Sequence, residues 1–379
     1  MENTSIEKPF WFEAMWTRDV SSKEVVESAW HTRVDGPQNL KLAKKLDATR
    51  RDLKRWNKSC FGSSRERIKE LEQKIARIQS LKATKENLEL EASLSLELDE
   101  WLAREDLKWK QKSREIWIRE GDRNTRFFHL STLIRRMRNY IQEIKLEDDS
   151  WINDREDIQK YFIENFKALY QTGSPNIPKN LENFIEPCIS NIENEELCRV
   201  PMRDEIQKII FEMKSLKAPR LDGFPALFYK HYWEIVGDQI VTGTQSFFGD
   251  GRLLNEFNQT FISLIPKKKG ACNFNQFWPI SLCNVCYKVI SKIIVNRLRP
   301  LLSKMVDLAQ VAFVPNCWII EKMALAQEVV HSFKKTQKKK GFLWVKLDFQ
   351  KAYDRMEWNF LIIVLKAFEF CAKFISLIH

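Results

Sequence analysis

The chain has 379 residues, of which 44% are hydrophobic and 12% aromatic, so it is long enough to bury the cores of two or three domains and is not a disordered protein. Its 62 Lys and Arg residues outnumber its 51 Asp and Glu residues, and the net charge of +11 favours a polyanionic partner such as nucleic acid, although many basic proteins share this balance. No apolar run approaches a membrane span and Met1–Phe12 lacks the pattern of a signal peptide, so we expect no membrane partner and a soluble, intracellular protein, with nucleus and cytoplasm not distinguished.

The 8 cysteines are scattered over the chain, which favours reduced thiols over a disulfide framework. One Cys-x-x-Cys pair occurs, at Cys283 and Cys286. A zinc site would need a second pair or nearby histidines, and the nearest candidates are Cys272 and the distant His331. Ordinary buried thiols are therefore the favoured interpretation.

Residues 1–37 are rich in aromatic side chains and end at the turn signal Asp35-Gly36-Pro37. Two interpretations stay open for them: a packing surface whose partner is absent, or a short segment that caps the helices after residue 37. The aromatic residues are Phe10, Trp11, Phe12, Trp16 and Trp30.

From Leu40 to about Lys112 the chain has no proline and one glycine, Gly62, and apolar residues recur among charged ones at helical spacing. This pattern predicts long antiparallel helices that break at Gly62 and Ser63-Ser64, with Ser64 as a weak N-cap. A charge-rich helical pair is most often a solvated spacer, and this interpretation is favoured over a dedicated binding device.

Basic and aromatic residues interleave from Trp109 to Arg138. Arg and Lys can meet phosphates while Trp and Phe stack on unpaired bases, so this stretch is the best candidate for RNA binding before the C-terminal third. A basic helix surface packed on its own core is an alternative of equal weight. The candidate nucleic-acid-binding residues here are Arg114, Arg123, Arg126, Arg135 and Arg136.

Short elements are expected in the middle of the chain. Residues 141–150 predict a strand pair, and the Pro- and Asn-rich linker Gly173–Asn183 predicts a domain boundary. A compact loop at Lys217–Pro225 then leads into an aromatic helix. Two further helices are expected around Ile158–Tyr170 and Arg203–Leu216.

Residues 260–270 predict a β-strand that runs into Lys267-Lys268-Lys269. These lysines would present mobile cations to phosphate groups, and a solvated hairpin tip is the plain alternative. Phe277 is expected to open a helix whose apolar residues face inward. The outer side of this helix carries three more candidates for nucleic-acid binding, Lys288, Lys292 and Arg299.

The segment Leu343–Trp358 starts with alternating apolar residues, which predict a β-strand with Asp348 at its end. From Lys351 the spacing changes to three and four residues, so the strand is expected to turn directly into an amphipathic helix. A carboxylate at such a corner suits either a metal ion or the cap of a helix, and spacing alone favours the cap.

A particular order of motifs runs along the chain. It includes Gly121-Asp-Arg-Asn-Thr-Arg-Phe-Phe-His129, Asp222-Gly-Phe-Pro225, Leu264-Ile-Pro-Lys267, Phe277-Trp-Pro-Ile-Ser-Leu282, Gln310-Val-Ala-Phe-Val-Pro315 and Leu347-Asp-Phe-Gln-Lys-Ala-Tyr-Asp-Arg355. In this combination the chain resembles the reverse transcriptases of non-LTR retrotransposons, in the form that plant long interspersed elements (LINEs) have.

The resemblance implies a mostly α fold with an α+β part, in which a long helical tower or linker precedes the fingers and a partial palm of a right-hand polymerase. Residues 1–25 would be a remnant that follows a lost endonuclease domain. The other segments would be the helical linker or tower at 26–140, a pre-polymerase approach region at 141–259, and a truncated reverse transcriptase domain at 260–379.

The resemblance also implies a chemistry. Two Mg²⁺ ions held by carboxylates would activate the 3′-hydroxyl of a DNA primer against a dNTP on an RNA template. Asp348 matches the first metal-binding, catalytic aspartate, and the backbone carbonyl of Phe349 would complete one metal shell. Lys267 matches a lysine that binds the triphosphate, and Tyr353 matches the aromatic residue that screens the nucleotide sugar.

Departures from the family pattern indicate lost activity. Trp278 stands where the family has an Arg that grips the triphosphate, Arg220-Leu221 replaces Gly-Pro, and Asn316-Cys317 replaces Gly-Arg. The sequence reaches His379 without the Asp-Asp loop that supplies the other metal ligands, so functional binding of Mg²⁺ and dNTP is not expected. We therefore expect a fragment of an RNA-directed DNA polymerase that is inactive alone. The alternative is a non-catalytic nucleic-acid-binding protein derived from a retroelement.

Overall fold

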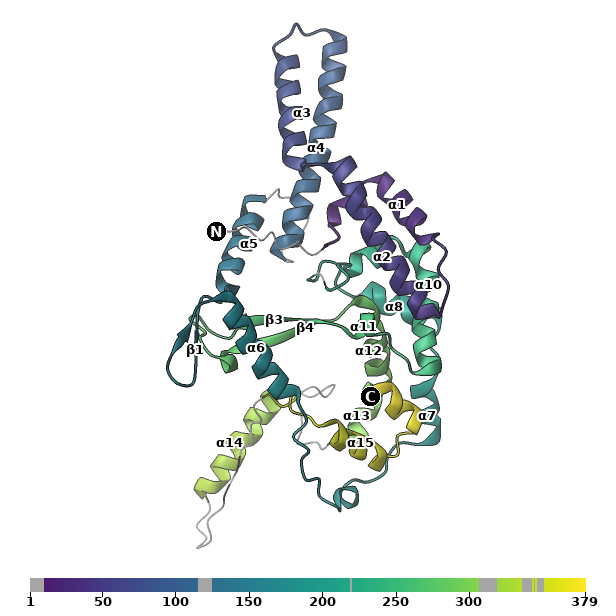
Figure 1. The fold of residues 1–379 in the computed structure, drawn as a ribbon, viewed down its shortest axis with the longest axis vertical. Coiled ribbons are helices and arrows are strands. Elements are labelled where there is room, and N and C mark those ends of the chain that lie inside the picture. Colours follow the sequence, from purple (N-terminus) through teal and green to yellow (C-terminus); the bar gives the residue numbers. More distant parts are fainter. Residues whose placement is uncertain are drawn as a thin grey trace. The chain divides into compact units, whose positions relative to one another are not determined.

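The computed structural model describes residues 10–114, 125–218, 220–306, 319–335 and 351–379, together with Leu343 and Val345. Helices dominate these residues and the strands among them form two small sheets, so the predicted mostly α fold with an α+β part is confirmed (Figure 1). The chain divides into two compact units, one of Met1–Asp154 with Pro201–Ser291 and one of Arg155–Val200 with Lys292–His379. Within the described ranges, no helix is long and apolar enough to cross a membrane.

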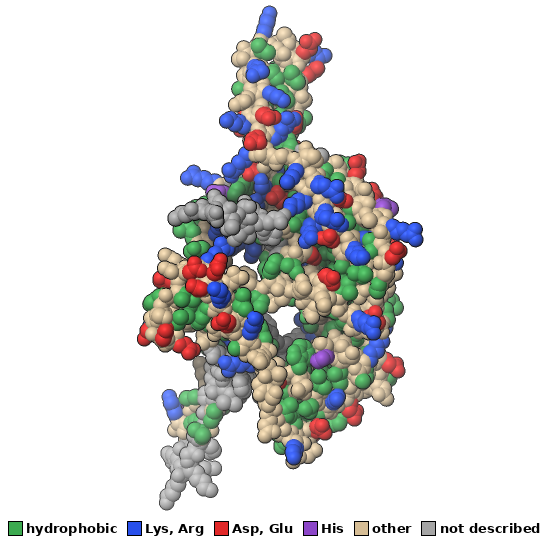
Figure 2. Space-filling model, viewed as in Figure 1, with side chains coloured by type: hydrophobic (Ala, Val, Ile, Leu, Met, Phe, Trp, Pro, Cys, Tyr) green, Lys and Arg blue, Asp and Glu red, His purple; other side chains and the backbone are tan. Residues whose placement is uncertain are grey.

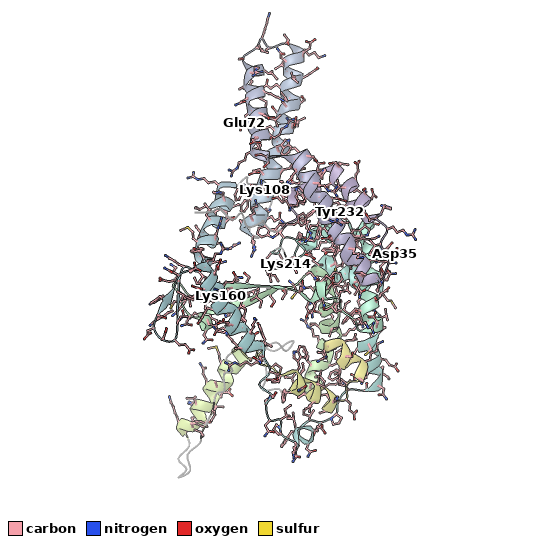
Figure 3. The ribbon with its side chains drawn as sticks, viewed as in Figure 1. Asp35, Glu72, Lys108, Lys160, Lys214 and Tyr232 are labelled. Atoms are coloured by element: carbon pink, nitrogen blue, oxygen red, sulfur yellow. The ribbon has the colours of Figure 1, made fainter. Side chains whose placement is uncertain are left out.

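The first unit begins with aromatic residues that pack on the chain itself. The buried ring of Phe12 lies 5.4 Å from that of Phe228 and 6.1 Å from that of Tyr232. The Tyr232 hydroxyl, labelled in Figure 3, hydrogen-bonds the Ser22 hydroxyl at 2.7 Å. The structure therefore supports the interpretation of residues 10–37 as a segment that packs on the rest of this chain, rather than a surface for an absent partner. The elements here are η1 (Ala14–Arg18), α1 (Val20–Trp30), α2 (Gln38–Trp56) and η2 (Asn57–Phe61).

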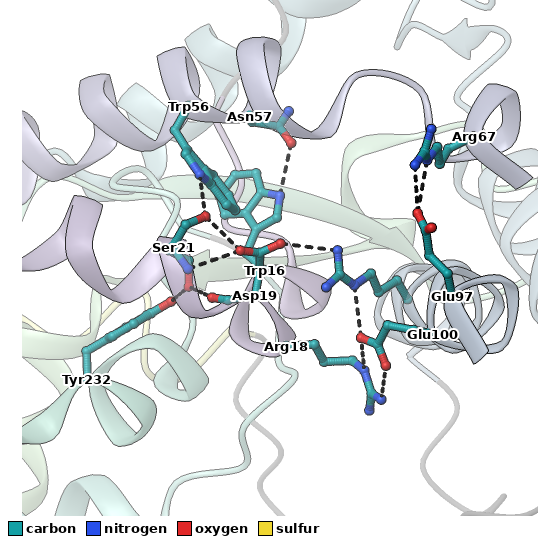
Figure 4. Close-up of polar contacts among 12 residues, drawn as sticks. Trp16, Arg18, Asp19, Ser21, Trp56, Asn57, Arg67, Glu97, Glu100 and Tyr232 are labelled. Atoms are coloured by element: carbon teal, nitrogen blue, oxygen red, sulfur yellow. Dashed lines mark hydrogen bonds and ion pairs between the residues drawn. The ribbon is translucent and has the colours of Figure 1, made fainter. Parts of the chain in front are cut away.

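A set of ion pairs joins the start of this unit to α4 (Lys85–Ser113), as Figure 4 shows. Arg18 donates two hydrogen bonds to the Glu100 carboxylate, at 2.9 and 2.5 Å. These bonds, with the one that Arg104 donates, lower the pKa of Glu100 to about 2. Arg104 also lies 3.2 Å from Asp19, the residue that caps α1. The N-terminal segment is therefore held to α4 by charge as well as by packing.

The helix α3 (Ser64–Gln79) runs antiparallel to α4 beside it (Figure 1), whereas the sequence predicts antiparallel helices on the two sides of Gly62. The predicted break at Gly62 is confirmed, and a second break at residues 80–84, which the sequence pattern did not reveal, separates α3 from α4. Charged side chains of both signs, including Glu72, cover this pair (Figures 2 and 3), as expected of a solvated spacer.

The N-cap of α3 is Ser63 rather than Ser64, because the Ser63 hydroxyl accepts a hydrogen bond from the Glu66 N–H at 3.4 Å. The buried Ser64 donates its hydroxyl to Glu105 of α4 instead. Burial alone would raise the pKa of Glu105, but the Ser64 hydrogen bond and the charge of Lys108 outweigh burial and lower it. A buried carboxylate thus ties the first turn of α3 to α4.

Two antiparallel hairpins provide the strands of the first unit. β1 (Ile144–Lys145) pairs with β2 (Trp151–Ile152), as predicted for residues 141–150. β3 (Phe261–Pro266) pairs with β4 (Phe277–Leu282), with Phe261 opposite Leu282 and Pro266 opposite Phe277.

The prediction that Phe277 opens a helix is wrong. Residues 277–282 are the strand β4, and the helix α12 (Val285–Leu298) begins only after it. The backbone groups of β3 need partners, and β4 supplies them in a register that no local pattern in the sequence reveals. The prediction that apolar residues face inward is confirmed on α12, since Ile290 and Ile293 are buried there.

The other helices of the first unit pack around the aromatic cluster. α10 lies beside α2 (Figure 1) and contributes the buried residues Trp233 and Val236. α8 ends at Glu212, four residues before the predicted end at Leu216. The bounds are α5 (Thr125–Asn139), α8 (Arg203–Glu212), α9 (Ala226–His231), α10 (Trp233–Asp250), α11 (Asn255–Asn258) and η4 (Phe274–Gln276).

The second unit is built on a small apolar core to which Leu197, Leu365 and Phe374 contribute buried side chains. The linker Gly173–Asn183, predicted as a domain boundary, lies inside this unit, so that prediction is wrong. The bounds are α6 (Arg155–Tyr170), η3 (Leu181–Phe184), α7 (Asn191–Cys198), η5 (Arg299–Leu301), α13 (Leu302–Met305), α14 (Ile319–Lys335), α15 (Trp358–Ala367) and α16 (Ala372–Ile378).

The helix expected directly from Lys351 starts later, at Trp358, so the predicted strand-to-helix corner is wrong at its helical side. Lys351 has a φ of 54°, in the left-handed region, and opens a series of turns instead. Glu357, just before α15, accepts hydrogen bonds from the Thr172 hydroxyl at 2.7 Å and the Gly173 N–H at 3.0 Å. These bonds hold the start of α15 against the linker of the same unit.

Gly223 adopts a φ of 79°, and a Cβ added there would lie 2.3 Å from the Phe10 carbonyl oxygen. We expect Gly223→Ala to lower the free energy of unfolding by about 2 kcal/mol or more, because it strains the backbone and displaces the aromatic segment. Urea denaturation followed by tryptophan fluorescence measures the change. Gly249→Ala, where the added Cβ meets nothing within 4 Å, is the control and should be neutral or stabilising. Equal effects of the two substitutions would contradict this role of Gly223.

Candidate functional site

The predicted catalytic and metal-binding residues Asp348 and Phe349 lie outside the described residues, and so does Arg123. Tyr353 lies in the turns that precede α15 and is 74% exposed. Among the described side chains, no group of three or more His, Cys, Asp and Glu residues could hold a metal ion. The Mg²⁺ site that the resemblance implies stays a prediction.

Lys267 follows the end of β3 and is bonded within its own hairpin. Its Nζ donates to Asn275 O at 2.8 Å, and its backbone N–H donates to Gln276 O at 2.8 Å. Its ammonium group therefore helps to close the hairpin in this conformation. The exposed residues Lys268 and Lys269 follow it in the turn.

The aromatic side chains of the basic stretch pack within the first unit. The ring of Trp109 lies 4.5 Å from that of His129, in an edge-on arrangement, and the Lys112 ammonium lies 5.2 Å from the Trp109 ring. Phe128 is almost fully buried. For these rings the structure favours the alternative interpretation, a helix surface packed on its own core.

The arginines of the same stretch divide into two groups. Arg135 donates a hydrogen bond to Ser113 O and so joins α5 to the end of α4. Arg114 follows α4 with a left-handed φ of 58°. Burial of the Arg114 guanidinium and the charge of Arg135 lower the pKa of Arg114. Arg126 and Arg136 lie exposed on α5, where they can meet an anionic partner.

The end of α5, the segment that leads into β1, Trp151 of β2 and the turn of the β3–β4 hairpin line a hollow of about 640 Å³, which we name the α5 groove. The hairpins are joined by the Lys145 N–H, which donates to Cys272 O at 2.7 Å. The groove combines exposed aromatic rings with cations: Tyr140 and Trp151 with Arg138, Lys268 and Lys269. Sequence reasoning found the lysines but not the rings, although both rings flank the predicted strand pair at residues 141–150.

The three basic residues predicted on the outer side of one helix do not form one set. Lys288 belongs to the first unit, where it is partly buried, and burial with the charges of Arg220 and Lys217 lowers its pKa. Lys292 and the exposed Arg299 belong to the second unit.

The loop at residues 217–225 buries polar groups. The Asp222 carboxylate accepts the Phe224 N–H at 3.1 Å through Oδ1, and its Oδ2 is buried with no hydrogen-bond partner among the described residues. Burial raises the pKa of Asp222 to about 6. Nε and Nη1 of Arg220, and the hydroxyl of Tyr229, are likewise buried without a described partner. Arg220, noted in the sequence as a departure from Gly, thus places a cation inside the first unit.

Comparison with known proteins agrees with the motifs. Residues 265–379, which hold β4, α12 and the segment with Asp348, match the family described as reverse transcriptase (RNA-dependent DNA polymerase). The resemblance to reverse transcriptases is thereby confirmed for this part of the chain.

One curated relative extends the likeness beyond that part. Over 321 residues, 80% of the chain, the sequence is 27% identical to the Transposon TX1 uncharacterized 149 kDa protein of Xenopus laevis. The chain spans 24% of the length of that protein. The similarity to a transposon protein therefore includes segments before the polymerase motifs.

We expect Asp222→Asn to stabilise the protein at pH 7.5. The pKa of Asp222 is about 6 in the folded protein against an ordinary value of 3.8, so its stabilising contribution is present below about pH 4 and is lost as the pH rises through 6. The substitution should raise the free energy of unfolding by about 2 kcal/mol at pH 7.5 and have little effect at pH 4.

Urea denaturation at the two pH values, compared between Asp222→Asn and the wild type, measures this difference. Asp250→Asn, at an exposed carboxylate that ends α10, is the control for loss of one negative charge. A gain of the same size at both pH values would show that ionisation of Asp222 is not the cause.

Proposed function

We propose that this chain is part of the RNA-directed DNA polymerase of a non-LTR retrotransposon, of the LINE type that plants have. The observation that carries the proposal is the match of residues 265–379 to the reverse transcriptase family. The similarity to a transposon protein over 80% of the chain supports it, because it extends across the helices that precede the polymerase motifs. An RNA template and a DNA primer are the partners that this function requires.

Within this function each segment has a proposed place. Residues 26–140 are the helical tower or linker, 141–259 the approach region, and 260–379 the fingers and the first part of the palm of a right-hand polymerase. Residues 1–25 follow the position of an endonuclease domain. The antiparallel pair of α3 and α4 and the β3–β4 hairpin supply elements that suit the tower and the fingers.

In an intact enzyme of this type, Asp348 and the carbonyl of Phe349 would hold Mg²⁺, which would supply charge stabilisation for transfer of a nucleotide from dNTP to the primer. Tyr353 screens the nucleotide sugar, and its exposed position in the turns before α15 allows such a contact. Lys267 would bind the triphosphate in the intact enzyme, for which its Nζ would exchange the Asn275 carbonyl for phosphate oxygens.

We further propose that the 379-residue chain does not polymerise DNA alone. Two metal ions need several carboxylates, and the sequence from Asp348 onward contains no adjacent pair of aspartates. Trp278, at the place of an Arg that the family uses for the triphosphate, lies half-exposed in β4 and offers no charge for it.

We expect no primer extension by the purified chain on an RNA template with annealed DNA primer, dNTP and Mg²⁺. Denaturing gel electrophoresis of a labelled primer measures the product, and an active reverse transcriptase in the same buffer is the positive control. Extension that Asp348→Ala abolishes would overturn the proposed inactivity and would support the assignment of Asp348.

A second candidate function is non-catalytic binding of single-stranded nucleic acid. The α5 groove favours it, because aromatic rings next to cations can stack on bases while the cations meet the backbone phosphates. Tyr140 and Trp151 are exposed there, and Arg126 and Arg136 extend the basic surface along α5. This function needs neither Mg²⁺ nor dNTP.

We expect Lys268→Glu/Lys269→Glu to weaken binding of single-stranded RNA by roughly tenfold or more, and to reduce the slope of log Kd against log salt concentration by about 1 to 2. Trp151→Ala should weaken binding by roughly tenfold with the salt slope unchanged, since a base loses its stacking partner. Fluorescence anisotropy with a labelled oligonucleotide over a salt series measures both effects.

Lys69→Glu/Lys74→Glu is the matched control, because it makes the same change of charge on exposed positions of α3. Its binding should stay close to that of the wild type. If it binds RNA as weakly as Lys268→Glu/Lys269→Glu, net charge rather than the groove governs binding.

A further inference from the structure

Two cysteines from distant parts of the sequence meet in the second unit. Cys198 is the last residue of α7, and Cys371 directly precedes α16. Their Sγ atoms lie 3.4 Å apart, although 173 residues separate them along the chain. Cys198 is buried and Cys371 is partly exposed. Both are free thiols in the structure.

Hydrogen bonds from α7 hold the backbone of Cys371 in this place. Asn194 lies one helical turn before Cys198, so the two side chains share a face of α7. The Asn194 side chain accepts from the Cys371 N–H at 2.8 Å and donates to Glu369 O at 2.8 Å. The Phe374 N–H donates to the Cys371 Sγ at 3.5 Å. These hydrogen bonds therefore hold Cys371 where its sulfur contacts that of Cys198.

The apolar core of the second unit fixes the other side of the pair. Leu197, next to Cys198, and Phe374, one turn after Cys371, are both almost fully buried in the same cluster. A disulfide needs an S–S distance of about 2.05 Å, so the sulfurs must approach by somewhat more than 1 Å. Rotation about the side-chain bonds of two neighbouring cysteines supplies such a movement without separating the helices.

We propose that Cys198 and Cys371 form an oxidation site at which a peroxide converts the two thiols into an intrachain disulfide that joins α7 to α16. The inference is independent of the proposed polymerase and binding functions.

Oxidation of the two thiols to a disulfide proceeds in two steps. The partly exposed Cys371 attacks hydrogen peroxide as the thiolate, the O–O bond breaks, and a sulfenic acid and hydroxide form, the latter taking up the thiol's proton as water. The Cys198 sulfur then attacks the sulfenic sulfur, an S–S bond forms, and the hydroxyl leaves as a second water with the Cys198 proton. Two thiols are oxidised and one peroxide is reduced.

The environments of the two thiols assign these roles. Burial, together with the contact to Cys371, raises the pKa of Cys198 well above its ordinary value, which keeps this thiol protonated and slow to react with peroxide; the charges of Lys373 and Arg297 offset this only in part. Cys371 is reached from solvent. Cys371 is therefore the thiol that is oxidised first, and Cys198 is the thiol that resolves it.

The test uses the full chain, treated with hydrogen peroxide and then with an alkylating agent at low pH to block the remaining thiols. Digestion with trypsin and a glutamate-specific protease without reduction separates Cys188 from Cys198, because Glu193, Glu195 and Glu196 lie between them. Mass spectrometry should find Leu197–Arg199 linked to Phe370–Lys373, with the link reversed by dithiothreitol and formed at the same rate at all protein concentrations.

Cys188→Ser is the matched control, because Cys188 packs on the same core, and this variant should keep the linked peptide. Cys371→Ser should lose it and leave Cys198 open to slow alkylation. The wild-type peptide map decides the question even if a variant does not fold. Complete oxidation of the wild type that yields no Cys198–Cys371 peptide, or yields mixed pairs with Cys188, overturns the proposal.

Discussion

Burial of aromatic rings is the constraint on which the first unit depends. Phe12 packs against both Phe228 and Tyr232, and its N–H donates a hydrogen bond to Gly223 O at 3.0 Å. A buried ring of this size contributes several kcal/mol from the area that it removes from water. The core that α1, α2 and α10 share therefore requires contact between the N-terminal segment and residues about 200 positions later in the sequence. The N-terminal segment is an integral part of this unit and not an appendage to it.

The loop that receives Phe12 also carries buried polar atoms without hydrogen-bond partners among the described residues. Asp222 and Arg220 are buried beside Gly223 with polar atoms that no described group satisfies. Each such atom costs on the order of 1 to 3 kcal/mol, which the aromatic packing on the same loop offsets. A long side chain at position 220 enters the core of the first unit, since Arg220 is buried there.

Local patterns predict much of the helical part, the β1–β2 pair and the strand β3, but not β4 or the break at residues 80–84. The helices after Gly62 follow from helical spacing and from the absence of proline, whereas the break at residues 80–84 has no glycine or proline to reveal it, only the cap of Thr84 on the Asn87 N–H. The sequence predicts a helix where β4 lies, because the register that pairs β4 with β3 does not show in the spacing of its residues. In the candidate site, charge revealed Lys268 and Lys269, but the bond of Lys267 to Asn275 O depends on the shape of the turn.

The pair of α3 and α4 has a mechanical consequence. The base of the pair is fixed by Glu105, Arg104 and Glu100. Near residues 80–84 the two helices mainly contact each other, for example through the hydrogen bond from the Gln79 side chain to Glu91. Opening from the distal turn breaks few contacts, so amide exchange should be fastest at that end and slow progressively toward the base. Because lengthening both helices by whole heptads leaves the base unchanged, this pair can vary in reach during evolution while the core of the unit stays the same.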